Sequence, residues 1–321
     1  MRHLTRSTVT VAVGVLIGVV ILVFVTNGSG LAPAAILVST LAIATPLLLA
    51  AMGGLISERA GVVNIGLEGM MIVGALAGFL ISNATGSWVA GVAGGAIAAG
   101  LLALVHAFVS IVLNADQVIS GTAVNLLGLF GTEYVFRTFF GLGSELPAIQ
   151  RAPTLAFPGL GSLNIITIVA VVAVPVLAFV MFRTPVGLRL RSVGENPLAA
   201  QTVAIHVVKL RFAAVILSGV LAGIGGAYLS VGSLGSFSEG MTNGRGFIAL
   251  AAVIVGRWNP FGALAACLLF AVVSALGNGF QVSAGISADL TAGMPYLLTL
   301  IAIVVFRESA SAPASLGKPL R

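Results

Sequence analysis

Long apolar segments recur along almost the whole chain, and they limit the folds that it can adopt. Ten such segments are present, at roughly 8–26, 33–56, 62–82, 88–113, 119–136, 163–182, 212–232, 246–256, 261–280 and 288–306. Most approach the roughly 20 residues that a helix needs to cross a bilayer. Only 7% of the 321 residues are charged, whereas soluble domains have about 25%. The chain is therefore expected to be an integral membrane protein.

All ten segments are expected to be helices, because a spanning segment must satisfy its own backbone polar groups inside the bilayer. None shows the alternating pattern of a transmembrane barrel. The polar stretches between them are short, so residues 1–321 are expected to form one membrane domain. The sequence thus predicts an all-α polytopic protein with about ten spanning or partly spanning helices.

The distribution of basic residues predicts that both termini are cytoplasmic. In that orientation twelve basic residues are inside, namely Arg2, Arg6, Arg59, Arg183, Arg189, Arg191, Lys209, Arg211, Arg257, Arg307, Lys318 and Arg321, and three are outside, namely Arg137, Arg151 and Arg245. Such an excess follows the positive-inside rule. It also accounts for the net charge of +6 without any nucleic-acid partner. The expected location is the bacterial inner membrane.

Two apolar segments are unsuited to smooth spanning helices. Residues 244–256 are too few to cross alone, and the segment that opens at Gly61 begins with polar residues. Broken helices are tolerated in membranes only where they line a cavity or are buried in protein. Short or Gly-interrupted segments in corresponding halves of a chain are the best sequence indicators of a transport site. We therefore expect both segments to be broken or re-entrant and to lie near a translocation path.

Small residues four apart predict close helix packing inside the bundle. The pairs are Gly74 and Gly78, Gly91 and Gly95, and Gly219 and Gly223. Such spacing lets helix backbones approach one another.

Two polar residues in the segment after Gly61 are the first candidates for the path. If the helix begins at Asn64, then Asn64 and Glu68 share one face. An ionisable group inside a span costs about 2.5 to 3.5 kcal/mol even on permissive insertion scales, so it normally faces a cavity or a partner. Two roles stay open for Glu68, which are contact with substrate and satisfaction of backbone amides freed around Gly61 and Gly66.

Other polar and aromatic side chains are further candidates for substrate contact. Asn125 and Gln117 can hydrogen-bond a ribose or a base, and Phe130, Phe247 or Tyr228 can stack on a ring. Asn125, Phe130 and Phe247 complete the predicted path with Asn64 and Glu68.

Glu58, Arg59 and Trp258 are expected at the inner boundary of the membrane. No special function is predicted for the two charged residues, and Trp258 is expected to act as an interfacial anchor. The outer loop from Arg137 to Asn164 contains three prolines and is expected to be a connector with one helical turn, or the place where a binding protein docks.

No pattern typical of an enzyme is present. The three histidines, His3, His106 and His206, are far apart, and there is no HExxH motif, no G-x-S-x-G elbow and no phosphate-binding P-loop. Cys267 is the single cysteine, so no thiol pair exists for metal or redox chemistry. We expect no catalytic residue and no metal site.

The longest inner loop, at about 183–211, is expected to contain a short helix at 197–205. Asn196 is a plausible N-cap, and Pro197 would occupy the first helical position. A structured cytoplasmic loop of this kind suggests a docking partner.

Five segments together resemble the membrane permease subunits of ABC importers for nucleosides and simple sugars, a group that includes permeases for ribose and branched-chain amino acids. They are RAGVVNIGLEGMM, NADQVISGTAVNLLG, GLRLRSVGENPLAAQTVAI, LSGVLAGIGGAYLS and GRGFIALAAVIVGRWNPFGA, and the resemblance covers about residues 40–305. The VVNIGLEGMM variant is most similar to one member of the nucleoside-type permease pair.

The resemblance implies a subunit that forms the path for nucleosides and hydrolyses no ATP itself. Its implied partners are a homologous second permease, cytoplasmic ATPase subunits that hold ATP and Mg, and an extracytoplasmic binding protein. The residues that match the ATPase coupling loop are Gly194, Glu195, Asn196, Pro197, Ala199 and Ala200. Simple sugars and branched-chain amino acids are alternative substrates, and an ion-coupled secondary transporter that uses Glu68 is a rival class.

One departure from the group lies at the end of this loop. Ala204 and Ile205 stand where members usually have Gly and Ile, and we expect the helix to continue through the alanine.

Overall fold

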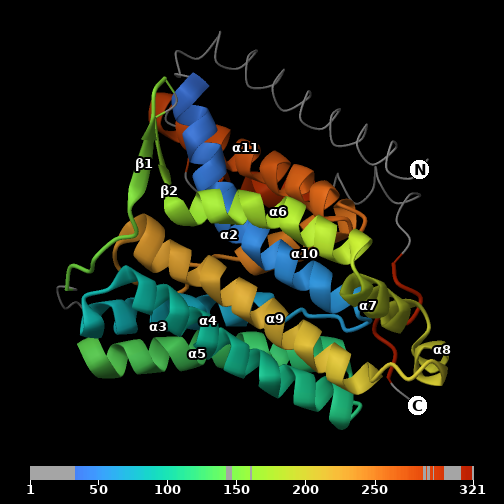
Figure 1. Ribbon diagram of the computed structural model, residues 1–321. Coiled ribbons are helices and arrows are strands. Elements are labelled where there is room, and N and C mark those ends of the chain that lie inside the picture. Colours follow the sequence, from blue (N-terminus) through green and yellow to red (C-terminus); the bar gives the residue numbers. More distant parts are fainter. Residues whose placement is uncertain are drawn as a thin grey trace.

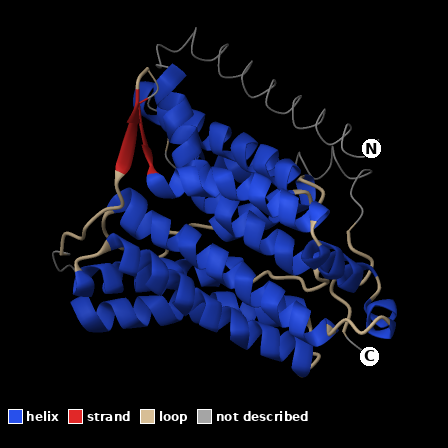
Figure 2. Cartoon of the chain, in the orientation of Figure 1, coloured by secondary structure: helices blue, strands red, loops and turns tan. Residues whose placement is uncertain are grey.

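The computed structural model describes residues 33–141, 147–159, 161–284, 287, 290–291, 293–299 and 312–319. Within them the chain is mostly helical (Figures 1 and 2). The elements are α2 (Pro33–Arg59), α3 (Leu67–Thr85), α4 (Trp88–Ala107), η1 (Phe108–Val112), α5 (Gln117–Phe140), β1 (Thr154–Phe157), β2 (Gly161–Asn164), α6 (Ile165–Arg183), α7 (Pro185–Glu195), α8 (Pro197–Thr202), α9 (Val207–Ala227), η2 (Tyr228–Leu234), α10 (Arg245–Val255) and α11 (Pro260–Ala284). η1 and η2 are π-helical extensions of α4 and α9.

Six helices in the described ranges are long and apolar enough to cross a membrane. They are Pro33–Arg59, Leu67–Thr85, Trp88–Val112, Ile165–Arg183, Val207–Leu234 and Pro260–Gln281. α5 is 24 residues long but less apolar, and α10 has 11 residues, too few to span alone, as predicted. The predicted span at 8–26 lies outside the described residues, as does most of the one at 288–306. The chain is thus a polytopic helical membrane protein, and the count of ten stays a prediction.

Close backbone contacts between α3, α4 and α9 form the centre of the bundle. A Cβ atom on Gly74 would lie 2.5 Å from the Cα atom of Gly223, and one on Gly223 would lie 2.5 Å from the carbonyl oxygen of Gly95. Only glycine permits such an approach. The predicted role of the glycine pairs as packing sites inside the bundle is confirmed.

A β-hairpin replaces the helical turn predicted in the outer loop. β1 and β2 pair antiparallel, with Thr154 opposite Asn164 and Phe157 opposite Gly161. The side chain of Asn164 then accepts a hydrogen bond from the backbone N–H of Ile166 and caps α6. Pairing satisfies the backbone polar groups of a segment whose prolines disfavour a helix. The fold is therefore helical with one small hairpin.

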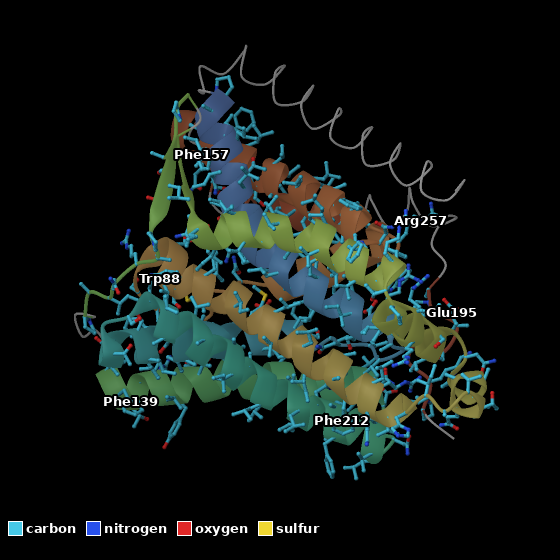
Figure 3. The ribbon with its side chains drawn as sticks, viewed as in Figure 1. Trp88, Phe139, Phe157, Glu195, Phe212 and Arg257 are labelled. Atoms are coloured by element: carbon cyan, nitrogen blue, oxygen red, sulfur yellow. The ribbon has the colours of Figure 1, made fainter. Side chains whose placement is uncertain are left out.

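The hairpin lies at one end of the bundle, and α7 and α8 lie at the other (Figure 1). Figure 3 shows Trp88 and Phe157 at the hairpin end and Glu195 and Arg257 at the α7 end. This separation agrees with the sides assigned from the basic residues. The orientation in the membrane stays a prediction.

Candidate translocation site

The segment between α2 and α3 is a broken helix, as its sequence predicts. α2 ends at Arg59 and α3 begins at Leu67, and Gly61 between them has φ +89°. The predicted common face of Asn64 and Glu68 is wrong, because Asn64 lies before the first helical residue. Inside a membrane protein the backbone polar groups of such a segment need partners.

Side chains from other elements supply these partners. The backbone N–H of Val63 donates to Gln117 Oε1 at 2.7 Å, and the carbonyl oxygen of Val63 lies 3.1 Å from His106 Nε2. Asn125 bridges the end of the break, because its Nδ2 donates to the carbonyl oxygen of Ile65 at 2.9 Å and its Oδ1 accepts from the N–H of Gly69 at 2.8 Å. Gln117, His106 and Asn125 therefore hold the broken backbone in place.

Glu68, in the first turn of α3, caps the N-terminus of α10. Its Oε1 accepts from the backbone N–H of Gly244 at 2.8 Å, and its Oε2 accepts from that of Gly246 at 2.6 Å. Gly244 is the N-cap residue of α10 and has φ +74°. The positive dipole ends of α3 and α10 thus meet at one carboxylate, whose negative charge offsets both.

This arrangement decides one of the two open roles of Glu68. The carboxylate accepts hydrogen bonds from backbone amides, which is the second of these roles. The amides belong to the start of α10, however, and not to the residues around Gly61 and Gly66. The two segments that looked broken in the sequence therefore meet directly.

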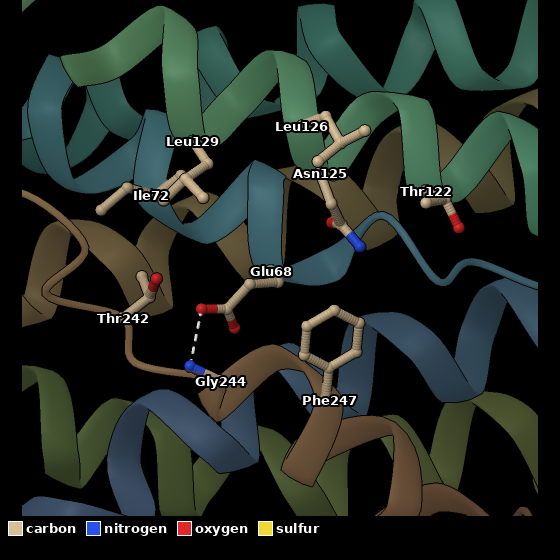
Figure 4. Close-up of a pocket in the computed structure, with 9 residues that line it drawn as sticks. All are labelled: Glu68, Ile72, Thr122, Asn125, Leu126, Leu129, Thr242, Gly244 and Phe247. Carbon is tan, nitrogen blue, oxygen red and sulfur yellow. Dashed lines mark hydrogen bonds between the residues drawn. The ribbon is translucent and has the colours of Figure 1, made fainter.

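A cavity of about 340 Å³ opens beside this junction. Its lining comes from α3, α5, α10 and the loop before α10, and consists of Glu68, Ile72, Thr122, Asn125, Leu126, Leu129, Thr242, Gly244 and Phe247. Figure 4 shows the Glu68 carboxylate between the α5 side chains on one side and Phe247 and Gly244 on the other. The volume lies in the lower part of the range of small-molecule sites, about 300 to 1,000 Å³.

The structure brings three of the five predicted path residues to this cavity, namely Glu68, Asn125 and Phe247. Asn64 is fully buried elsewhere, and its Nδ2 donates to Ser218 Oγ at 2.9 Å. Phe130 lies on α5 away from the cavity lining, with 61% of its surface exposed.

Six further lining residues were not predicted from the sequence, namely Ile72, Thr122, Leu126, Leu129, Thr242 and Gly244. Thr122, Leu126 and Leu129 lie three residues before, one after and four after Asn125 on α5, so helical spacing from Asn125 would have indicated Thr122 and Leu129. Thr242 lies in the non-helical loop before α10, where no periodicity exists to indicate it.

Glu58, Arg59 and Trp258 form a hydrogen-bonded cluster at the end of the bundle where the inner boundary was expected. Trp258 Nε1 donates to Glu58 Oε2, and Arg59 Nε donates to the carbonyl oxygen of Trp258 at 2.8 Å. Glu58 and Trp258 are almost fully buried. The cluster joins the end of α2 to the turn between α10 and α11 at the α7 end of the bundle.

The predicted short helix of the inner loop is present as α8. Asn196 Oδ1 accepts from the backbone N–H of Ala199 at 3.0 Å, and Pro197 is the first helical residue. Gly194 and Ala200 are buried, whereas Glu195, Asn196 and Ala199 are exposed, and Pro197 lies between these extremes.

Ala204 does not continue this helix. α8 ends at Thr202, and Ala204 has φ +59° in the left-handed region. A residue with a Cβ atom is strained there, whereas glycine is not. The expected helical continuation is therefore wrong, and glycine would relieve the strain at this position.

We accordingly expect Ala204→Gly to stabilise the protein by about 1 kcal/mol, because left-handed backbone costs a non-glycine residue about 1 to 3 kcal/mol and the added chain entropy of glycine offsets part of the gain. Thermal denaturation in detergent measures the change. Ala213→Gly, within α9, is the matched control and is expected to destabilise by about 1 kcal/mol. A melting temperature of the Ala204→Gly protein below that of the unsubstituted protein would show that the backbone at Ala204 is not strained.

A bundle in which two broken helices meet at a partly polar cavity is typical of membrane transport proteins. The chain belongs to the family described as "Branched-chain amino acid transport system / permease component", whose model matches residues 36–304. It is a transport permease and not an enzyme, and it is a multi-pass protein of the bacterial inner membrane.

Three relatives illustrate the similarity. The guanosine ABC transporter permease protein NupQ of Bacillus subtilis is 38% identical over 88% of this chain and 94% of its own. The nucleoside ABC transporter permease protein NupC of Lactococcus lactis is 34% identical over 88% and 95%. The putative glucose ABC transporter permease protein TsgC13 of Haloferax volcanii is 41% identical over 76% and 77%.

Each of these organisms has a second, less similar permease. NupP, NupB and TsgB13 are 25%, 25% and 28% identical to the chain. The chain is thus more similar to one member of each pair. No solved structure matches it.

Proposed function

We propose that the chain is a permease subunit of an ATP-driven ABC importer and forms the translocation path for nucleosides. The observation that carries this proposal is its 38% and 34% identity, over 88% of its length, to permeases named for guanosine and for nucleosides. In this proposal residues 1–321 form one domain of about ten helices, and both termini are cytoplasmic.

The chemistry of the cavity supports a neutral, hydroxylated ring as its ligand. Each oxygen of Glu68 accepts one backbone N–H and keeps a second lone pair for a sugar hydroxyl. The ring of Phe247, which lines the cavity and is 46% exposed, can stack on a base. Glu68, Asn125 and Phe247 are the residues that we propose to contact substrate. Asn64 and Phe130 complete the proposed path away from this cavity.

The same geometry disfavours an amino acid as the ligand. An amino-acid carboxylate binds well at helix N-termini with free backbone N–H groups. At this junction Glu68 already occupies the N–H groups of Gly244 and Gly246, and its negative charge would repel a second carboxylate.

Glucose is the second candidate, because TsgC13 is 41% identical over 76% of the chain. Competition for uptake of labelled guanosine separates the two candidates. We expect excess unlabelled nucleoside to abolish uptake and excess glucose to leave it unchanged. Uptake of labelled glucose without uptake of guanosine would overturn the nucleoside assignment.

The proposed partners are a homologous second permease, cytoplasmic ATPase subunits that bind ATP and Mg, and an extracytoplasmic binding protein. The paired permeases of the three organisms support a heterodimer. Uptake by the reconstituted complex is expected to stop when the ATPase subunits cannot hydrolyse ATP. Uptake by the single chain under a proton gradient without nucleotide would instead support a secondary transporter.

The surface proposed to dock on the ATPase is α8 with its flanking residues. Leu198 and Val203 are 61% and 68% exposed there, and we expect each to enter an apolar groove of the ATPase. Leu198→Asp is expected to weaken ATPase binding at least about tenfold, since burying an unpaired charge costs more than 1.4 kcal/mol. Co-purification of the ATPase measures the effect.

Leu198→Met is the matched control, because it keeps an apolar side chain of similar size. It is expected to bind the ATPase as the unsubstituted protein does. Equal binding by the Asp and Met variants would remove α8 from the docking surface.

A further inference from the structure

A buried arginine lies at the α7 end of the bundle without a carboxylate partner among the described residues. Arg211, in the first turns of α9, is 1% exposed. In the described ranges the basic residue of each ion pair is Arg137. Burying a charge costs several kcal/mol unless hydrogen bonds satisfy it. The guanidinium of Arg211 therefore has to find its partners among neutral groups.

Those partners come from two segments far apart in the chain. Arg211 Nε donates to the carbonyl oxygen of Ala60 at 3.1 Å. Its Nη1 donates to the carbonyl oxygen of Lys318 at 3.3 Å, and its Nη2 to Ser315 Oγ at 3.3 Å. Ala60 follows the last residue of α2, where the helix dipole favours a cation.

Residues 312–319, which we call the strap, also hold the end of α7. The backbone N–H of Ser315 donates to the carbonyl oxygen of Gly194 at 2.9 Å, and Ser315 Oγ donates to the same oxygen at 2.5 Å. The N–H of Gly317 donates to the carbonyl oxygen of Gly61 at 3.2 Å. In Figure 1 the red segment that leads to the marked C-terminus lies beside α7 and α8.

The strap thus links the proposed coupling loop to the start of the broken segment. Gly194 begins the coupling residues, and Gly61 begins the segment that leads to Glu68. Gly194 also packs directly on the carbonyl oxygen of Arg59. Packing resists compression but not separation, whereas hydrogen bonds resist both. The strap therefore gives α7 a connection through which it can pull on the broken segment.

We propose that residues 312–319 transmit movement of the coupling loop to the broken segment, with Arg211 and Ser315 as positioning residues. This inference rests on the proposed function. Movement of α8 on its ATPase shifts Gly194, and through Ser315, Gly317 and Arg211 it shifts Ala60 and Gly61, which opens or closes the cavity beside Glu68. A coupling mechanism of this kind is an element in contact with both sites, here the coupling loop and the broken segment, whose conformation depends on the state of each.

The test compares uptake with hydrolysis in the full complex reconstituted in vesicles, with labelled guanosine as the probe. Two altered complexes are made, one with a chain that lacks residues 312–321 and one with the variant Ser315→Ala. In both, the chain is expected to bind the ATPase subunits, and these subunits are expected to hydrolyse ATP. Guanosine imported per ATP hydrolysed is expected to fall at least about fivefold, the lower end of typical coupling energies. A purely structural role would lower thermal stability and leave this ratio unchanged.

Lys318→Ala is the matched control, because Arg211 binds the carbonyl oxygen of Lys318 and not its side chain. Its ratio is expected to equal that of the unsubstituted complex. If the shortened chain fails to insert, Ser315→Ala decides the question. An unchanged ratio for Ser315→Ala overturns the proposal. If the unsubstituted complex imports no guanosine, the proposed function fails, which is a separate result.

Discussion

Gly246→Val is expected to abolish transport, because the N-termini of α3 and α10 can no longer meet. A Cβ atom at position 246 would lie 2.5 Å from the Cα atom of Glu68 and would also overlap its backbone nitrogen. Both are backbone atoms in the first turn of a helix, so neither can move alone. Overpacking typically costs about 1 to 3 kcal/mol, and a contact between backbones belongs at the upper end of that range.

Guanosine uptake by the reconstituted complex and thermal denaturation in detergent measure the effect. Gly131→Val is the matched control, since nothing lies within 4 Å of a Cβ atom at position 131 on α5. It is expected to retain both uptake and stability. Uptake by Gly246→Val at the level of Gly131→Val would mean that the two helix ends separate in the working protein.

Substitution of Glu68 is expected to have the second large effect. Glu68→Ala leaves the N–H groups of Gly244 and Gly246 without their acceptors, at about 1 to 3 kcal/mol for each buried group. It also removes the negative charge between two helix N-termini. We expect a protein that is destabilised by about 2 kcal/mol or more and that imports no guanosine.

Glu68→Gln separates substrate contact from support of the backbone. The amide keeps one acceptor oxygen but turns a donor toward one of the two N–H groups. If Glu68 contacts the substrate, the variant loses a charge-assisted hydrogen bond to a sugar hydroxyl, which contributes about 1.5 kcal/mol to binding. The KM for guanosine is then expected to be about tenfold higher. Measurement of KM and maximal rate for uptake tests this.

Ser230→Ala is the control for loss of a buried hydrogen bond away from the cavity. Ser230 Oγ donates to the carbonyl oxygen of Ala75 at 2.8 Å, so its substitution is expected to lower stability by about 1 kcal/mol with no change in KM. If Glu68→Gln lowers stability and leaves KM unchanged, Glu68 only supports the backbone.

The broken segments were predictable because their signals are local. Glycine and polar residues near Gly61, and the shortness of 244–256, conflict with a smooth span whatever the rest of the chain does. The cap and the first residue of α8 were predictable for the same reason, since Asn196 and Pro197 act on neighbouring residues.

The roles of Asn125, Gln117 and His106 were not predictable in this way. Each is a polar residue on or beside an apolar segment. In such a place a polar side chain can contact the substrate, hydrogen-bond the backbone or pack inside the bundle. Their partners Ile65, Gly69 and Val63 lie 43 to 60 residues away in sequence. The hairpin and the left-handed Ala204 were also missed, because strand pairing and a helix end depend on what lies beside them.

The sequence by itself determined that this is a helical membrane protein with two broken segments, because the free energy of transfer into lipid depends on the composition of each segment. Only the tertiary structure decided what Glu68 does. Its acceptor oxygens meet the N–H groups of Gly244 and Gly246, 176 and 178 residues away, and that pairing exists only because α3 and α10 pack end to end. The strap depends on packing in the same way, since Arg211, Ser315 and Gly194 become neighbours only in the folded bundle.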